Sequence, residues 1–168
     1  MEQDPGSYPT AITFHVAAAA EEMPRHRFGP RTALVFSYWL SKAAGRAAPT
    51  RPDIDPAEIP PALGYIVLWD VLENGARVIC RLAGTSLCEL AGRELRGRTV
   101  EEIHWDRPGA AKLEFQRVVS TLEPDYVERA LEWTNTRVYR PYGRLLLPLV
   151  GPTERAPAAM LLSIVDFL

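Results

Sequence analysis

The pattern of apolar and polar positions divides the chain into a series of helices and strands. A helix is predicted from Thr32, which can act as its N-cap, to about Gly45. Its wide apolar face comprises Leu34, Val35, Tyr38, Trp39 and Leu40. A face of this width must lie against another part of the protein. Residues 1–31 carry proline, glycine and serine and predict a flexible N-terminal arm, so the domain is expected to span residues 32–168.

The segment after residue 63 carries the strongest β-hairpin signal in the chain. Residues 64–73 and 76–84 each predict a strand, and the Asn74-Gly75 pair predicts a type I′ turn between them. The first strand is apolar on both faces, so we expect it at the centre of a sheet that is covered on both sides. One cover should be the helices that follow. The other should be the helix of residues 32–45 or a second copy of the protein.

The remainder of the chain predicts helices first and strands afterwards. Thr85 can cap a short helix, Thr99 can begin a second with a capping box, and Pro108 can open a third. Strands are then predicted at residues 126–134, 144–150 and 158–167. This order predicts an α+β fold: a single five-stranded antiparallel sheet with helices on one face and an N-terminal flanking helix.

Residues 50–60, which join the first helix to the hairpin, contain three prolines and three acidic residues. Asp55, Pro56 and Glu58 stand in the order of an N-cap, a proline at the first helical position and a capping-box partner. A metal site is the alternative, because Asp53 and Asp55 are two residues apart, but such a site needs more oxygen ligands. We therefore interpret residues 50–60 as a shaped connector rather than a metal site. Its structural residues are Asp53, Asp55, Pro56 and Glu58.

Composition narrows the class of protein. The chain has 168 residues and a net charge of −2. Its length indicates one domain with an extension, and its 47% hydrophobic residues exclude a disordered chain. The arginines are scattered rather than clustered, and no apolar run approaches the ~18 residues of a membrane span, so we expect neither nucleic acid nor membrane as a partner. Cys80 and Cys88 form no metal pattern, and the N-terminus carries no export signal. The expected location is the cytoplasm.

Several short motifs resemble the PAS domain. Residues 83–103 (AGTSLCELAGRELRGRTVEEI) are similar to the PAS core segment. The chain also resembles a bacterial family of small, often stand-alone PAS-type proteins in four places that occur in the same order. These are the Tyr38-Trp39 pair, the RPDIDPAEIP connector, RLAGT at residues 81–85 and LPL at residues 147–149. The resemblance covers about residues 34–166.

The resemblance implies a sensory or regulatory module rather than an enzyme. Such a module receives a small molecule in a pocket between the sheet and the helices of residues 85–122, and signals through flanking helices or a dimer. Because the chain leaves no room for an output domain, we expect a homodimer and a signalling-protein partner. The interface candidates are Tyr38 and Trp39. The ligand-binding candidates are Trp105, Phe115, Arg129, Trp133 and Tyr142.

No cofactor is expected. Haem-binding PAS domains take an axial histidine from the helical region in which His104 lies, but a single histidine beside Trp105 is more typical of a packed or surface residue. Flavin photosensors need a reactive cysteine in an Asn-Cys-Arg-Phe-Leu-Gln motif, which this chain lacks. Cys88 lies earlier, in an apolar helix where a thiol packs as a small hydrophobe.

The arginines of the C-terminal strands permit two interpretations. Arg129, Arg137, Arg140 and Arg144 could form an anion-binding wall for a carboxylate or phosphate. The interpretation we favour is that they are solvated edge-strand charges. No nucleophile elbow or phosphate-binding loop is present, so a small enzyme is the weakest hypothesis, behind a small-molecule sensor and a ligand-free adaptor.

Overall fold

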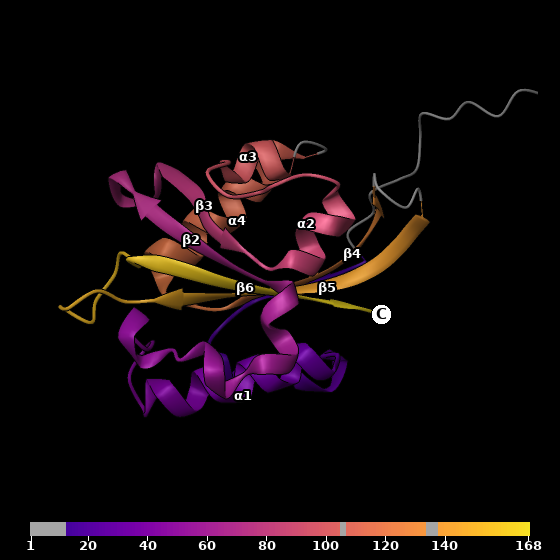
Figure 1. Cartoon of the computed structure of the whole chain (residues 1–168). Coiled ribbons are helices and arrows are strands. Elements are labelled where there is room, and N and C mark those ends of the chain that lie inside the picture. The colour runs from indigo at the N-terminus through magenta and orange to yellow at the C-terminus, as the bar shows by residue number, and fades with distance from the viewer. Residues whose placement is uncertain (1–12, 105–106, 134–137) are drawn as a thin grey trace, which may run out of the picture.

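Six strands form one antiparallel sheet in the order β1-β4-β5-β6-β2-β3 (Figure 1). Their bounds are β1 (Phe14–Ala17), β2 (Ile66–Leu72), β3 (Arg77–Ala83), β4 (Asp125–Trp133), β5 (Val138–Leu149) and β6 (Met160–Phe167). This computed structural model describes residues 13–104, 107–133 and 138–168, and it describes the backbone but not the side chains of residues 131–133, 138 and 139. The predicted single antiparallel sheet is present, but the predicted number of five strands is wrong.

Strand β2 lies between β6 and β3 and is covered on both faces, as its two apolar faces predicted. Ile66 and Leu68 belong to one hydrophobic core, and Val67 and Trp69 belong to a second core on the opposite face. The alternation follows from the two-residue period of a strand. The sheet therefore separates two cores, and each core needs its own cover.

Helix α1 (Pro30–Ala43) covers one face of the sheet within its own chain (Figure 1). Trp39 is 2% exposed, and its Nε1–H donates to the carbonyl oxygen of Pro148 at 2.9 Å. Trp39 is therefore a core residue of its own chain rather than the interface residue that the sequence predicted. The described part of the chain contains no helix long and apolar enough to cross a membrane.

The first turn of α1 is fixed by β6. The Asp166 carboxylate accepts from the backbone N–H of Arg31 at 2.8 Å and of Thr32 at 3.3 Å, and it pairs with the Arg31 guanidinium at 2.8 Å. Gly29 is the N-cap, where a Cβ would overlap the Asp166 side chain. The predicted N-cap at Thr32 is therefore three residues late, because the capping group comes from a distant strand rather than from the Thr32 hydroxyl.

Three helices cover the other face of the sheet (Figure 1): α2 (Thr85–Ala91), α3 (Val100–Ile103) and α4 (Pro108–Thr121). The predicted capping box of α3 is confirmed. Thr99 N–H donates to the Glu102 carboxylate at 2.9 Å, and Glu102 N–H donates to the Thr99 hydroxyl at 3.2 Å. Phe115 of α4 packs edge-on to Trp69 of β2, with ring centroids 4.9 Å apart.

Two local predictions differ from the structure. Residues 13–31 pack on the domain instead of forming an arm, since Phe14–Ala17 pairs with β4 and Met23 is buried in the core. Residues 1–12 lie outside the described part.

The β2–β3 connection is a four-residue loop rather than a type I′ turn, because Leu72 pairs with Arg77. Its residues Glu73, Asn74 and Gly75 all have positive φ.

The connector forms three 3₁₀ turns, Arg51–Asp53, Pro56–Glu58 and Pro60–Tyr65. Asp55 is the N-cap of the second, as predicted, and accepts from Ala57 N–H at 2.9 Å. The predicted capping-box role of Glu58 is wrong. Its carboxylate instead accepts from the Tyr38 hydroxyl and pairs with Lys42 at 2.9 Å.

Two further contacts hold the connector. The capping box belongs to the first turn, where Asp53 accepts from the backbone N–H of Thr50 at 2.8 Å and pairs with Arg46 at 2.9 Å. These donors lower the pKa of Asp53 to about 2. Tyr38, a predicted interface residue, accepts through its hydroxyl from Asp55 N–H at 2.8 Å. It therefore joins α1 to the connector.

Candidate functional site

A cavity of about 90 Å³ lies between the sheet and the helices that follow the hairpin. Strands β2, β5 and β6 supply one wall, and α2, α3 and the loop between them supply the other. The lining residues are Val67, Trp69, Leu87, Leu95, Ile103, His104, Tyr142, Arg144, Ser163 and Val165. This is the part of the fold in which the sequence predicted a pocket.

Polar groups converge on this otherwise apolar cavity. Ser163 accepts from Trp69 Nε1–H at 3.0 Å through its hydroxyl oxygen, so its own O–H is able to donate elsewhere. His104 donates through Nδ1 to the carbonyl oxygen of Val100 at 2.8 Å. Burial and the nearby charge of Arg144 lower the pKa of His104 to about 3, so the ring is neutral near pH 7 and Nε2 is an acceptor.

Arg144 belongs to a buried ionic cluster beside the cavity. Glu114 of α4 lies at its centre, where its carboxylate binds the guanidinium groups of both Arg129 and Arg144. Arg144 Nη2 also donates to Asp125 of β4 at 2.6 Å, and the second oxygen of Asp125 lies 2.6 Å from Nε2 of His15 in β1. The buried ionic cluster therefore connects the cavity with α4 and with the edge strand.

Two nitrogens of Arg144, Nε and Nη1, have no hydrogen-bond partner among the residues that the structure describes. The side chain is 4% exposed, so water does not replace these partners freely. Although burial alone would lower it, Asp125 and Glu114 hold the pKa of Arg144 above its usual value. Arg144 is therefore a permanently charged, buried donor with unused N–H groups, and its side chain lines the cavity.

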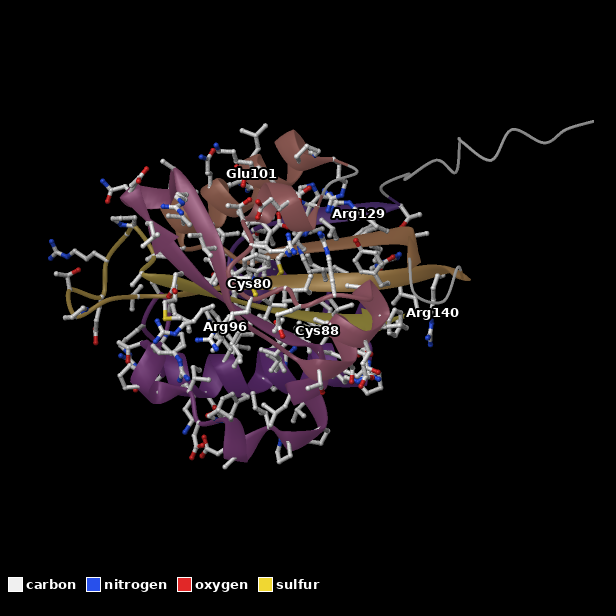
Figure 2. All side chains as sticks on the ribbon, turned by 45° about the horizontal axis from the view of Figure 1, so that its top comes forward. Cys80, Cys88, Arg96, Glu101, Arg129 and Arg140 are labelled. Carbon is white, nitrogen blue, oxygen red and sulfur yellow. The ribbon has the colours of Figure 1, made fainter. Side chains whose placement is uncertain are left out.

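The structure excludes one of the two interpretations for two of the four arginines. Arg129 is fully buried and Arg144 nearly so, which makes the edge-charge interpretation wrong for both. Arg140 is exposed, with its guanidinium carbon 3.9 Å from the centre of the Phe167 ring. Figure 2 shows Arg140 on the outside of the molecule and Arg129 inside it. Arg137 lies outside the described residues.

The predicted ligand-binding residues have different positions. Tyr142 lines the cavity. Phe115 packs next to the cavity, with the centre of its ring 5.3 Å from the guanidinium carbon of Arg144. Arg129 does not line the cavity, because Glu114 holds it in the buried ionic cluster. The predicted Trp105 lies outside the described residues, as does the side chain of Trp133.

Sequence reasoning missed Ser163. It is the one hydroxyl in the apolar strand MLLSIVDF, and that isolated position was the available signal. The sequence favoured His104 as a packed or surface residue over a haem ligand and did not predict that it lines the cavity. The cavity of about 90 Å³ is far smaller than the several hundred Å³ of a pocket for a large ligand.

Neither cysteine is activated, and the described residues contain no cluster arranged for a metal ion. Burial raises the pKa of Cys80 to about 12, and burial also raises the pKa of Cys88, so neither is a thiolate near pH 7. No group of three or more histidine, cysteine or acidic side chains in the described part of the chain is arranged to hold a metal ion.

Comparison with known families gives a match to the PAS domain over residues 27–160. Comparisons with curated proteins and with solved structures gave no match. The match covers most of the chain and includes α1, the connector, the hairpin, the three helices, β4 and β5. The resemblance to a stand-alone bacterial family with this connector stays a prediction. The chain belongs to the PAS domain family.

Proposed function

We propose that this protein is a non-catalytic sensory module that binds a small carboxylate in the cavity between the sheet and helices α2 and α3. The observation that carries the proposal is the buried guanidinium of Arg144, with two unpartnered nitrogens, at the wall of that cavity. An N–H group of a guanidinium donates a charge-assisted hydrogen bond to a carboxylate oxygen, and this bond is strongest where water is excluded.

The volume of the cavity restricts the size of the ligand. A space of about 90 Å³ is equivalent to roughly three water molecules at ~30 Å³ each. Acetate and pyruvate are of this order. The Ser163 hydroxyl and the neutral His104 ring are placed to contact the remainder of such a ligand, and Trp69 supplies an apolar wall.

Binding at Arg144 would alter contacts that reach other elements. The same guanidinium holds Glu114 in α4 and Asp125 in β4, and Asp125 holds His15 in β1. A ligand carboxylate at Nε or Nη1 would share the positive charge that these acids now neutralise through Nη2, and so weaken the attachment of α4 and β1. Transmission to a partner protein or a second copy would follow from this change.

A ligand-free adaptor is the second candidate function. Trp69 and Phe115 pack against each other between the sheet and the helices, and the cavity is well below the ~300 Å³ of an ordinary ligand pocket. In this case Arg144 would serve only to join α4 to the sheet.

Titration calorimetry with acetate and pyruvate, at constant ionic strength, separates the two candidates. Saturable binding to the wild type should weaken about tenfold or more in Arg144→Gln, because a hydrogen bond to a charged group contributes ~1.5–3 kcal/mol. Arg140→Gln, on the same strand but exposed, is the matched control and should bind as wild type does.

Because Arg144→Gln also removes contacts of the buried ionic cluster, Ser163→Ala provides a second variant that keeps every charge. It should weaken binding by a smaller factor. If neither carboxylate binds saturably to the wild type, or if Arg144→Gln and Arg140→Gln bind equally well, the sensor proposal is wrong and the adaptor is favoured.

A further inference from the structure

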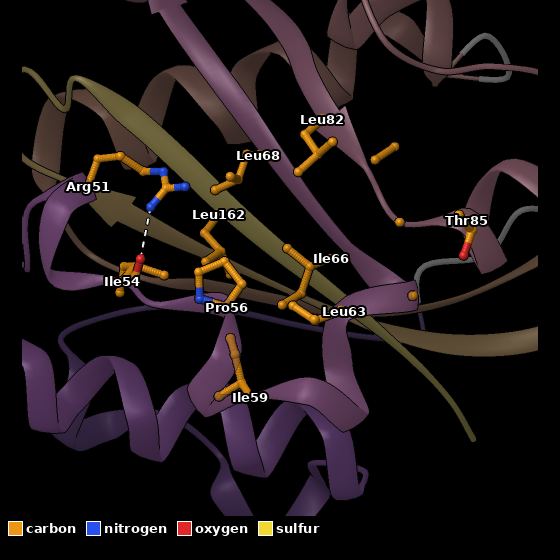
Figure 3. Close-up of a pocket in the computed structure, with 13 residues that line it drawn as sticks. Arg51, Ile54, Pro56, Ile59, Leu63, Ile66, Leu68, Leu82, Thr85 and Leu162 are labelled. Carbon is orange, nitrogen blue, oxygen red and sulfur yellow. Dashed lines mark hydrogen bonds between the residues drawn. The ribbon is translucent and has the colours of Figure 1, made fainter.

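A second and larger cavity, of about 310 Å³, lies on the opposite face of the sheet, under the connector (Figure 3). Strands β2, β3 and β6 form its floor, and the 3₁₀ turns of the connector form its wall. Its apolar lining includes Ile54, Ile59, Ile66, Leu68, Leu82 and Leu162. We call this cavity the connector groove.

Both ends of the connector are held in place where they frame this groove. At one end Asp53 is held by Thr50 and Arg46. At the other end the chain passes so close to Gly84 that a Cβ there would overlap the backbone of Gly64. Two fixed points of the chain therefore frame the groove.

The groove also leaves large apolar side chains in contact with water. Leu82 is 56% exposed and Leu63 is 39% exposed, and both line the groove. Covering these surfaces would be favourable by roughly 25 cal/mol per Å² of apolar area removed from water. An occupant with an apolar body is therefore expected.

Among the described residues that line the connector groove, Arg51 is the only charged one. Its Nη1 donates to the carbonyl oxygen of Ile54 at 2.9 Å, which holds the guanidinium at one end of the groove, as Figure 3 shows. Within the described part of the chain, no carboxylate pairs with Arg51. The occupant should therefore combine an apolar body with an anionic end.

We propose that the connector groove binds an aliphatic monocarboxylate of medium chain length, with the carboxylate at Arg51 and the alkyl chain over Ile66, Leu68 and Leu82. A volume of about 310 Å³ corresponds to on the order of ten non-hydrogen atoms at ~30 Å³ each, which is the size of octanoate. This site is separate from the cavity at Arg144, since the sheet lies between the two.

The first test is titration calorimetry of the full chain with hexanoate, octanoate, decanoate and dodecanoate, below their micelle-forming concentrations. Each added methylene contributes ~0.8 kcal/mol, so affinity should rise about fourfold per carbon until the groove is full near octanoate, and should then level off. An absence of saturable octanoate binding, or a rise in affinity that continues through dodecanoate, would overturn the proposal.

Variants then test each end of the site. Arg51→Gln should weaken octanoate about tenfold and leave the affinity for octanol unchanged, which also shows that the groove is intact. Leu82→Asp should weaken both ligands. Leu72→Asp, which changes an exposed leucine outside the groove on the neighbouring strand, is the matched control and should change neither. Equal affinity of the wild type and Arg51→Gln for octanoate would refute the role of Arg51.

Two further measurements distinguish the connector groove from the cavity at Arg144 and from a dimer interface. Pyruvate should not compete with octanoate, and Arg144→Gln should bind octanoate as wild type does, so failure of one proposal leaves the other standing. Sedimentation equilibrium tests a second copy as the occupant. A dimer that Leu82→Asp dissociates, in a protein that does not bind octanoate, would replace the carboxylate with a second copy of the chain.

Discussion

Replacing Trp39 with alanine tests whether α1 is an integral cover of the sheet. The side chain is 2% exposed, stacks on Phe36 with ring centroids 6.2 Å apart, and donates to the Pro148 carbonyl at 2.9 Å. Truncating a buried tryptophan typically costs 3–5 kcal/mol, which includes the cavity that remains. We expect Trp39→Ala to lower the free energy of unfolding by about 4 kcal/mol, a large share of the ~5–15 kcal/mol of a typical domain.

Equilibrium unfolding in urea measures this loss. Trp39→Phe keeps most of the apolar ring but leaves the Pro148 carbonyl without its donor, so it should cost about 1–2 kcal/mol. Leu34→Ala is the control on the same helix, at a residue that is 36% exposed, and should cost less than about 1 kcal/mol. Because Trp39 packs within its own chain, the loss should not depend on protein concentration.

A loss in Trp39→Ala no larger than that in Leu34→Ala would refute this prediction. In that case α1 would be a loosely attached extension, and another element would have to cover that face of β2. A loss that disappears at high protein concentration would contradict the prediction differently, by showing that α1 is held by a second copy rather than by its own sheet.

Three further predictions concern the connector, pH and cofactors. Asp55→Ala should lower the free energy of unfolding by ~1 kcal/mol through loss of the N-cap bond to Ala57, and a chelator should not reproduce that loss in the wild type. The folded pKa of His104 of about 3 lies below its ordinary 6.5, so its contribution to stability is fully present above pH 6.5 and is lost as the pH falls towards 3. The free energy of unfolding of the wild type, measured in urea, should therefore fall more steeply than that of His104→Gln across this interval, by up to about 1.4 kcal/mol per pH unit. Parallel curves would show that His104 does not titrate as inferred. The purified protein should show no absorption band in the visible region, and a Soret band that His104→Ala removes would establish haem.

Elements whose signals are local could be predicted from the sequence. The Thr99–Glu102 capping box, the Pro108 start of α4 and the two apolar faces of β2 depend on residues close together in the chain, and the structure has all three. The start of α1 could not be predicted, because its capping group is Asp166, more than 130 residues away.

The candidate site was harder to predict from the sequence, because its residues are brought together by contacts between distant parts of the chain. The burial of Arg144 follows from Glu114 on α4 and Asp125 on β4, and an arginine on a strand gives no local indication of such partners. Strand β1 was missed for a related reason. It has four residues, and its pairing partner β4 lies about 110 residues further along the chain.

The most direct test of the central claim is to observe the Arg144 guanidinium itself while a carboxylate is added. In nitrogen-15 NMR spectra, the Nε–H resonances of Arg144 and Arg140 can be assigned from the Arg→Gln variants and followed during a titration with pyruvate at constant ionic strength. We expect the Arg144 resonance to shift saturably and with the same dissociation constant as calorimetry gives, while that of the exposed Arg140 stays in place. An Arg144 resonance that does not respond to pyruvate or acetate, or one that moves only in parallel with Arg140, would contradict carboxylate binding at this guanidinium.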